Sequence, residues 1–347
     1  MTVSSQTEGL SAAAAEGTAP RGEEFRLVLD ARLPAKDVKR LTRVSPFLST
    51  LSVMQTLGII AAAAALPQVM PHPLVYAACV LVMASQQHAL AILAHEAVHY
   101  RLYNNRPVND IFGKLAGWMI SVSMLNYRIV HRLHHNHLYQ PIDPDLALQA
   151  GYPRGKSYLI KRLLKDVLGL TTIKNYAYFY GLPGSNTASA KDSKRTRQLI
   201  DDTSSALKHA ASRDRIIAAL FQVVVLAVAI ATGWWFEYLV LWLLPLLTIF
   251  QGLLRFRALA EHGAVPDTSD VRTATRTTMA SWWSRWLVFP HNVNYHLAHH
   301  LYPSIPHYRL KEAHRALEKA GILASAETCT LLQAWRKFFA DAEPKSA

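Results

Sequence analysis

Residues 44–94 read VSPFLSTLSVMQTLGIIAAAAALPQVMPHPLVYAACVLVMASQQHALAILA, and these 51 consecutive positions contain no Asp, Glu, Lys or Arg. One helix needs about 20 apolar residues to cross a bilayer, so this stretch is long enough to cross twice. Pro67, Pro71 and Pro73 interrupt it with a cluster of helix-breaking residues. We therefore predict two membrane-spanning helices, at about 46–66 and 74–94, joined as a hairpin by a tight turn.

A second stretch, 216–254, contains Glu237 as its only charged residue. It predicts a second hairpin, with spans at about 215–232 and 236–254 that turn at 233–237. Between the two hairpins, 111–125 is apolar but short for a span, so we expect a re-entrant or interfacial helix there. The fold class predicted is an all-α integral membrane protein with four transmembrane helices.

The composition of the chain supports this class. Hydrophobic residues make up 51% and charged residues only 18%, against about 25% in soluble domains. Intrinsic disorder, a secreted disulfide scaffold and an ordinary cytosolic enzyme are excluded. The only cysteines, Cys79 and Cys329, are too few for a disulfide framework or a cysteine-based zinc site.

The distribution of positive charge predicts the orientation. The net charge of +13 suits a nucleic-acid ligand or a membrane protein's positive-inside bias, and we favour the bias, with no nucleic acid as partner. The two outer turns, 67–73 and 233–237, contain no Lys or Arg, so all 37 lie on the other side or at its margin. We expect that side to be cytoplasmic, with both termini there.

Three regions are predicted along the chain. Residues 1–43 form a disordered and then basic cytosolic segment, whose first 20 residues lack the pattern of a cleavable signal, so the spans themselves direct insertion. Residues 44–310 form the membrane domain, with a loop at 181–186 and a charge run at 191–197. Residues 311–347 form a cytosolic tail, and everything after 255 is mostly helical by pattern.

The chain contains 16 histidines, and eight of them lie in three short clusters. They are HEAVH at 95–99, HRLHH at 131–135 and HLAHH at 296–300. On a helix, positions i, i+3 and i+4 share one face, so each cluster directs its nitrogens the same way. Neutral imidazole suits iron, zinc and copper. Eight imidazoles exceed what one metal can use, so we predict a site for two metals, on the cytoplasmic side of the spans.

Two other function classes fit parts of this pattern. HEAVH matches the H-E-x-x-H signature of zinc proteases, in which Glu96 would be the general base. That reading leaves six clustered histidines unexplained, and the chain has no Asp-Gly dipeptide of the kind that supplies a further ligand in membrane proteases. A non-enzymatic receptor or transporter predicts ionisable residues inside the spans, which contain almost none.

The clusters and their surroundings resemble the integral-membrane fatty-acid desaturase and hydroxylase superfamily. The matching stretches are AHEAVHYRLYNNRPVNDIFG (94–113), HRLHHNHLYQPIDPD (131–145) and PHNVNYHLAHHLYPSIPHY (290–308). The resemblance covers roughly 44–310 and implies four spans, a cytosolic helical cap that carries the histidines, and a non-haem di-iron centre. It also implies that a histidine after the fourth span completes the ligands, and His262 fits. The ligand set it implies is His95, His99, His131, His134, His135, His262, His296, His299 and His300.

Other residues near the clusters are not expected to bind metal themselves. Asp143, Asp145 and Asn294 are candidates to orient ligating imidazoles, although a plain turn explains the two aspartates equally well. The flanking residues His137, His291 and His307 are spare. No catalytic residue is expected beyond the metal ligands.

The resemblance implies an oxidase that uses O₂ and two electrons to desaturate the acyl chain of a fatty acid or lipid. A hydroxylase or ketolase of a lipid, carotenoid or other small apolar substrate stays open. The substrate would lie in an apolar tunnel from the spans, which Trp282, Trp283 and Trp286 either line or flank as an aromatic belt. The chain has no dinucleotide, iron–sulfur or haem motif, so a ferredoxin, rubredoxin or b-type cytochrome with its reductase is the expected electron donor.

Overall fold

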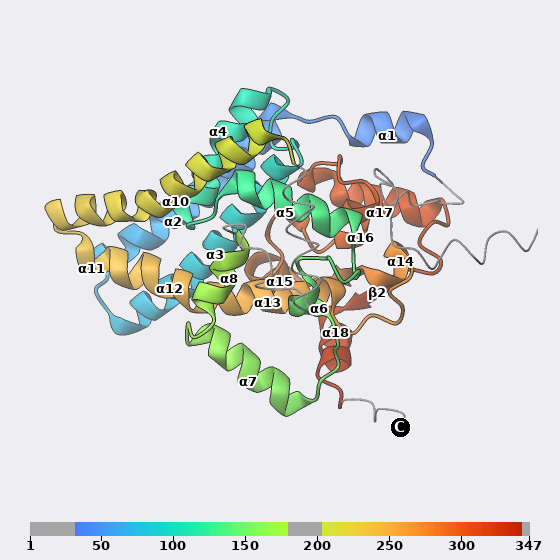
Figure 1. Cartoon of the computed structure of the whole chain (residues 1–347). Coiled ribbons are helices and arrows are strands. Elements are labelled where there is room, and N and C mark those ends of the chain that lie inside the picture. The colour runs from blue at the N-terminus through green and yellow to red at the C-terminus, as the bar shows by residue number, and fades with distance from the viewer. Residues whose placement is uncertain (1–31, 180–202, 342–347) are drawn as a thin grey trace, which may run out of the picture.

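The computed structural model describes residues 32–179 and 203–341, and this part of the chain is mostly helical (Figure 1). Four helical stretches in it are long and apolar enough to cross a membrane, and each contains nearly all of one predicted span. They are Pro46–Val69, Pro73–Val98, Ser205–Ala231 and Trp235–His262. The predicted disordered start, the loop at 181–186 and the charge run at 191–197 lie outside the described residues.

The first two of these helices, α2 (Pro46–Val69) and α3 (Pro73–Val98), pack against each other along the molecule. The turn between them is shorter than predicted. Pro67 lies inside α2, because a proline in the last turn of a helix sacrifices only one backbone hydrogen bond. Pro73 instead occupies the first position of α3, where its missing N–H costs nothing. Of the two, α3 is the central helix, because 67% of the residues in its most apolar stretch are buried, against 22% in that of α2.

The prediction of one helix over 111–125 is wrong in its extent, because two helices share this stretch and residues 120–123 separate them. Helix α4 (Arg106–Met119) ends there and α5 (Met124–Asn136) begins. Ser121 has a φ of +57°, and Ser123 caps α5 by accepting the N–H of Asn126. Asp214 of α10 (Ser205–Ala231) accepts hydrogen bonds from the Ser123 hydroxyl and the Leu125 N–H, which attaches α5 to α10.

A close approach of α4 to α3 holds the first histidine cluster in place. A Cβ on Gly113 of α4 would lie 2.2 Å from the Cβ of Ala97, so only glycine permits this contact. Ala97 lies between His95 and His99 in the sequence. The buried core around these residues joins α3, α4 and α5.

The fourth span is segmented rather than one helix. It consists of α11 (Trp235–Glu237), a π-helical turn η1 (Tyr238–Leu243), α12 (Leu244–Leu247) and α13 (Ile249–His262). Pro245 has no N–H to donate to the helix ladder, which accounts for the irregular turn before it. Thr248 has non-helical angles, with φ −126° and ψ −90°. The last segment, α13, extends well beyond the predicted end at 254.

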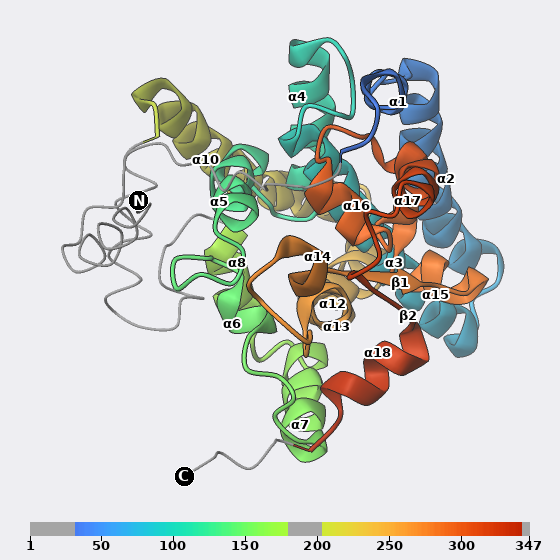
Figure 2. The same cartoon turned by 90° about the vertical axis from the view of Figure 1, so that its right-hand side faces the viewer.

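The remaining elements are short, and many of them gather at the opposite end from the α10–α11 turn (Figures 1 and 2). A two-stranded parallel sheet of β1 (Arg276–Met279) and β2 (Glu327–Thr330) lies in the part of the chain after 255 that was predicted to be mostly helical. Residues 327–338 pack through β2 and α18 against β1 and α13. The short elements are α1 (Ala35–Leu41), α6 (Leu146–Gln149), α7 (Lys156–Val167), α8 (Thr172–Phe179), α14 (Val271–Ala274), β1 (Arg276–Met279), α15 (Trp282–Leu287), η2 (Pro290–Asn292), α16 (His296–Leu301), η3 (His307–Arg309), α17 (Leu310–Lys319), β2 (Glu327–Thr330) and α18 (Leu331–Phe338).

Candidate metal centre

Four helices supply the nine histidines singled out in the sequence. The C-terminal end of α3 carries the first cluster, α5 the second and α16 the third, while His262 is the last residue of α13. The structure brings all nine together. Seven of them are buried, and His99 and His135 are partly buried.

The nine histidines fall into two groups, and within each group one nitrogen per residue lies within 4.8 Å of all the others. The first group is His95, His99, His131, His135 and His299, and the second is His134, His262, His296 and His300. Each group draws on at least three helices. A site of this kind therefore exists only when α3, α5, α13 and α16 are packed together.

The nitrogen–nitrogen distances fit shared metal ions. The Nε2 atoms of His131 and His135 are 3.0 Å apart, and those of His262 and His296 are 2.9 Å apart. Two imidazoles bound to one metal at about 2.1 Å hold their nitrogens about 3 to 3.4 Å apart. The groups are also adjacent, because the rings of His135 and His300 stack at 4.2 Å between centroids.

Burial keeps most of these imidazoles neutral. Desolvation, followed by repulsion between neighbouring histidines, lowers the pKa of His131, His299 and His300 well below the ordinary value. Neutral imidazole is the form that binds a metal. The electrostatics at these three histidines therefore favour metal binding at neutral pH.

His134 differs because it lies against two carboxylates. Burial opposes its protonation, but Asp143 and Asp145 outweigh burial and raise the pKa of His134 to about 9. The Nδ1 of His134 is 3.0 Å from Asp143 Oδ1 and 3.5 Å from Asp145 Oδ2. This contact directs Nε2 toward the second group, as carboxylates behind metal-binding histidines do.

Asp143 is therefore a positioning residue for the second group. The variant Asp143→Asn is expected to lower metal affinity about 10- to 100-fold, the usual cost of losing a carboxylate behind a ligating histidine. The affinity is measured by titrating the metal-free protein with iron. Asp267→Asn is the control, since Asp267 lies in an exposed turn, where its carboxylate accepts hydrogen bonds from Ser269 and Thr273. Equal iron affinities in the Asp143 and Asp267 variants would show that Asp143 does not position His134 for metal binding.

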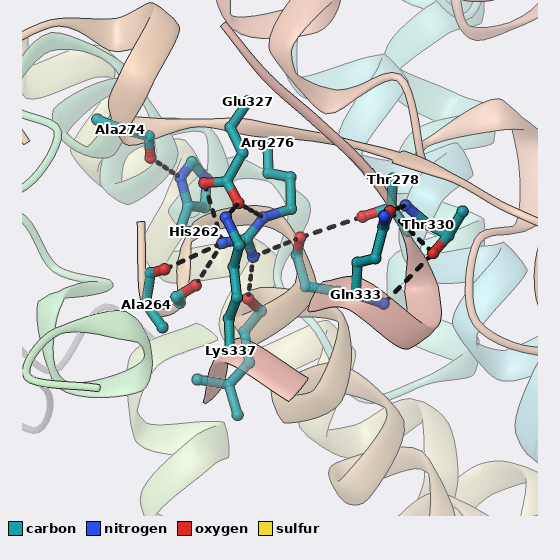
Figure 3. Close-up of polar contacts among 12 residues, drawn as sticks. His262, Ala264, Ala274, Arg276, Thr278, Glu327, Thr330, Gln333 and Lys337 are labelled. Carbon is teal, nitrogen blue, oxygen red and sulfur yellow. Dashed lines mark hydrogen bonds and ion pairs between the residues drawn. The ribbon is translucent and has the colours of Figure 1, made fainter. Parts of the chain in front are cut away.

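His262 is held by contacts that the sequence alone did not indicate. Its Nδ1 lies 3.1 Å from the carbonyl of Ala274, and Figure 3 shows it beside Arg276. The fully buried guanidinium of Arg276 donates to carbonyls at the end of α13, and it pairs with Glu327 of β2 at 3.0 Å. The carbonyls are those of Leu259, Ala260, Gly263 and Ala264. Arg276 thus caps the helix that presents His262.

Two further carboxylates, Glu261 and Glu96, approach the histidines. Glu261 Oε1 lies 3.5 Å from Nδ1 of His296. Glu96 Oε1 lies 3.8 Å from Nδ1 of His95, while its Oε2 accepts the backbone N–H of His307. A carboxylate engaged in holding the backbone is poorly placed as the general base of a zinc protease.

The spare histidines lie outside both groups. His137 contacts Gln140 at 3.1 Å, and His291 contacts Thr56 at 3.0 Å, with the ring of His307 beside it. The side-chain amide of Asn294 donates to the Thr278 carbonyl, with no imidazole contact among the described residues.

A cavity reaches the histidines, but it differs from the apolar tunnel expected from the sequence. Five of the nine histidines line it, together with side chains from α5, α6, α8 and α13 that are mostly polar. Trp282, Trp283 and Trp286 are not among its lining residues. They lie exposed on α15, as the aromatic-belt alternative requires.

The fold and the site define a class: a membrane protein with four apolar helices long enough to span a bilayer and a buried histidine cluster capable of binding metal. Residues 71–325 match the family described as fatty acid desaturase. The match covers well over half of the chain, so the chain belongs to this family, and it is an oxidoreductase.

Two relatives illustrate the range of the family. The chain is 29% identical to a dihydrorhizobitoxine desaturase from Bradyrhizobium elkanii, over 69% of this chain and 67% of that protein. It is 26% identical to a chloroplastic omega-3 fatty acid desaturase from Glycine max, over 76% of this chain. The match spans only 58% of the plant protein's length.

Proposed function

We propose that the nine histidines bind two non-haem iron ions, five in the first group and four in the second. The observation that carries this proposal is the division of the nine into two adjacent groups. A donor set made only of imidazole nitrogen suits iron, zinc or copper, and the desaturase family favours iron.

The reaction we propose is O₂-dependent desaturation of an acyl chain in a fatty acid or lipid. Iron bound at the site would supply, with O₂ and two electrons, the oxidising power that no side chain has. The balance is one C–C single bond, O₂, two electrons and two protons giving one double bond and two waters. The protein's own part is to orient the imidazoles through Asp143 and Arg276, to bind the substrate and to exclude bulk water.

Hydroxylation or ketone formation is the second candidate. It requires the same ligands and differs in whether oxygen stays on the substrate. A small shift in substrate position can decide between the two outcomes, because reactions at close range depend steeply on geometry. The names of all three related proteins, which call each of them a desaturase, favour desaturation for this chain.

The cellular arrangement is also a proposal. We infer two helical hairpins whose termini, together with a cap bearing the histidines, face the cytoplasm. The support is the absence of Lys and Arg from the two predicted outer turns. A separate carrier would deliver the electrons: a ferredoxin, which the name of a Helianthus annuus relative mentions, a rubredoxin or a b-type cytochrome with its reductase. A basic protein surface would attract an acidic carrier.

Metal analysis and lipid analysis test this function. We expect about two irons per purified chain, and stoichiometric zinc instead would contradict the di-iron centre. A host that expresses the chain is expected to accumulate lipids lighter by two hydrogens, as measured by mass spectrometry. A gain of one oxygen would indicate a hydroxylase, and changed carotenoids with unchanged lipids would indicate a ketolase.

A further inference from the structure

The wall of the cavity beside the histidines combines charged and polar side chains with apolar surface. Apart from five histidines, ten side chains surround it, and only Leu148, Leu254 and Ala258 among them are aliphatic. The cavity volume is about 60 Å³, room for only a few non-hydrogen atoms next to the histidines. Whatever part of a substrate reaches the oxidising centre through this cavity therefore meets polar groups at once.

Some of the polar lining is already engaged with other parts of the protein. Gln149 donates to Asp143, Arg255 pairs with the buried Asp166, and Asn175 donates to Gln251. These contacts fix the shape of the wall.

Arg257 and Glu261 are different, because part of their hydrogen-bonding capacity is unused, although Arg257 also forms a hydrogen bond with Tyr127. Arg257 Nη1 lies 3.5 Å from Glu261 Oε1, beyond a good charge-assisted hydrogen bond, which measures about 2.7–2.9 Å. Within the described residues, Arg257 Nε and Nη1 and Glu261 Oε1 are buried without a hydrogen-bond partner. Leaving charged groups in this state is costly, so a ligand that hydrogen-bonds them would be stabilised.

We propose that Arg257 and Glu261 bind the polar end of the substrate, an inference that rests on the proposed function and narrows its substrate. The guanidinium takes a carboxylate, and Glu261 takes a hydrogen-bond donor, either an ammonium or a hydroxyl group. Because the two protein groups are 3.5 Å apart, the matching groups of the substrate lie on the same or on neighbouring carbon atoms.

The position of this pair also limits which carbon is oxidised. Glu261 Oε1 is 3.5 Å from a nitrogen of His296, a member of the second histidine group. The oxidised C–C bond is then only a few bonds away from the carboxylate. The substrate is a single-chain amphiphile oxidised near its polar end, in contrast to a lipid oxidised in the middle of a long chain.

Three ten-carbon probes test this assignment on the iron-loaded protein in detergent. They are 2-aminodecanoate, which carries both polar groups, decanoate, which lacks the amine, and decan-1-ol, which lacks the carboxylate. Binding is measured by titration calorimetry. We expect 2-aminodecanoate to bind most tightly and decan-1-ol at least about tenfold more weakly, the cost of one hydrogen bond to a charged group.

Variants of Arg257 then test whether this residue binds the carboxylate of the probes. Arg257→Gln is expected to weaken both acids at least about tenfold and to leave decan-1-ol unchanged, while Arg257→Lys retains part of the affinity because it keeps the charge but loses the planar fork. Arg285→Gln, which removes an exposed arginine on α15 away from the cavity, is the matched control and should bind like the unmodified protein.

The outcomes separate this inference from the proposed function. Iron is quantified in every sample, so a protein that purifies without iron contradicts the di-iron function itself. Iron-loaded protein that binds decan-1-ol as tightly as the acids overturns only the substrate assignment. The same holds if Arg257→Gln weakens all three probes equally, which would indicate a general change in the cavity.

Discussion

Replacing His299 with alanine is expected to abolish substrate oxidation while the protein stays in the membrane. His299 is the one member of the first histidine group that comes from α16, and its Nε2 lies 3.2 Å from Nε2 of His135. Its loss removes one of five nitrogen donors and the link between α16 and the helices α3 and α5. The apolar helices that direct insertion are unchanged.

Two measurements check this expectation. The iron content of the purified variant should fall by about one ion per chain, and lipid mass spectrometry should detect no oxidised product. His137→Ala is the matched control, because His137 adjoins the second cluster in sequence but lies outside both groups. The ligand assignment would be falsified if His299→Ala retained near-normal oxidation.

Arg276→Met is expected to be the most damaging change that leaves every histidine in place. Methionine keeps much of the apolar stem but removes the guanidinium that donates to the carbonyls ending α13. It also leaves Glu327 without its buried partner. Removing one member of a buried ion pair costs about 3–5 kcal/mol of folding free energy. The free energy of unfolding should fall accordingly, with weaker iron binding in the second group through His262.

A neighbouring residue provides the control for this experiment. Lys337 also pairs with Glu327, but its side chain is 45% exposed. A solvent-exposed pair contributes at most about 1 kcal/mol, so Lys337→Met should change stability little. Stability is measured by thermal unfolding in detergent, with iron content determined in parallel. Similar losses in the two variants would show that Arg276 has no special role at the end of α13.

The sequence contains the class of fold and most of the site because both depend on local patterns. Span length and the absence of charge are properties of a single helix, and the described residues contain four such helices. The spacing of three and four residues places histidines on one face of a helix regardless of the rest of the chain. His262 has no such pattern, and only the family resemblance indicated it.

Other features could not be predicted from local patterns, because they arise where distant segments meet. The break between α4 and α5 depends on the Ser123 cap and on Asp214, about ninety residues away. The pairing of β1 with β2 joins segments about fifty residues apart, and each strand has only four residues. A strand that short carries too little periodicity to be recognised in the sequence.

The sequence by itself determined a helical membrane protein with three histidine clusters, since hydrophobicity and helical spacing act within single elements. Only the tertiary structure decided which histidines share a group: His134 and His135 are neighbours in the chain, yet they belong to different groups. It also decided that Asp143 lies against His134, that Arg276 pairs with Glu327 beside His262, and that charged side chains form part of the cavity wall. The physical reason is that a hydrogen bond or an ion pair depends on the distance between atoms, which is established only when the helices pack.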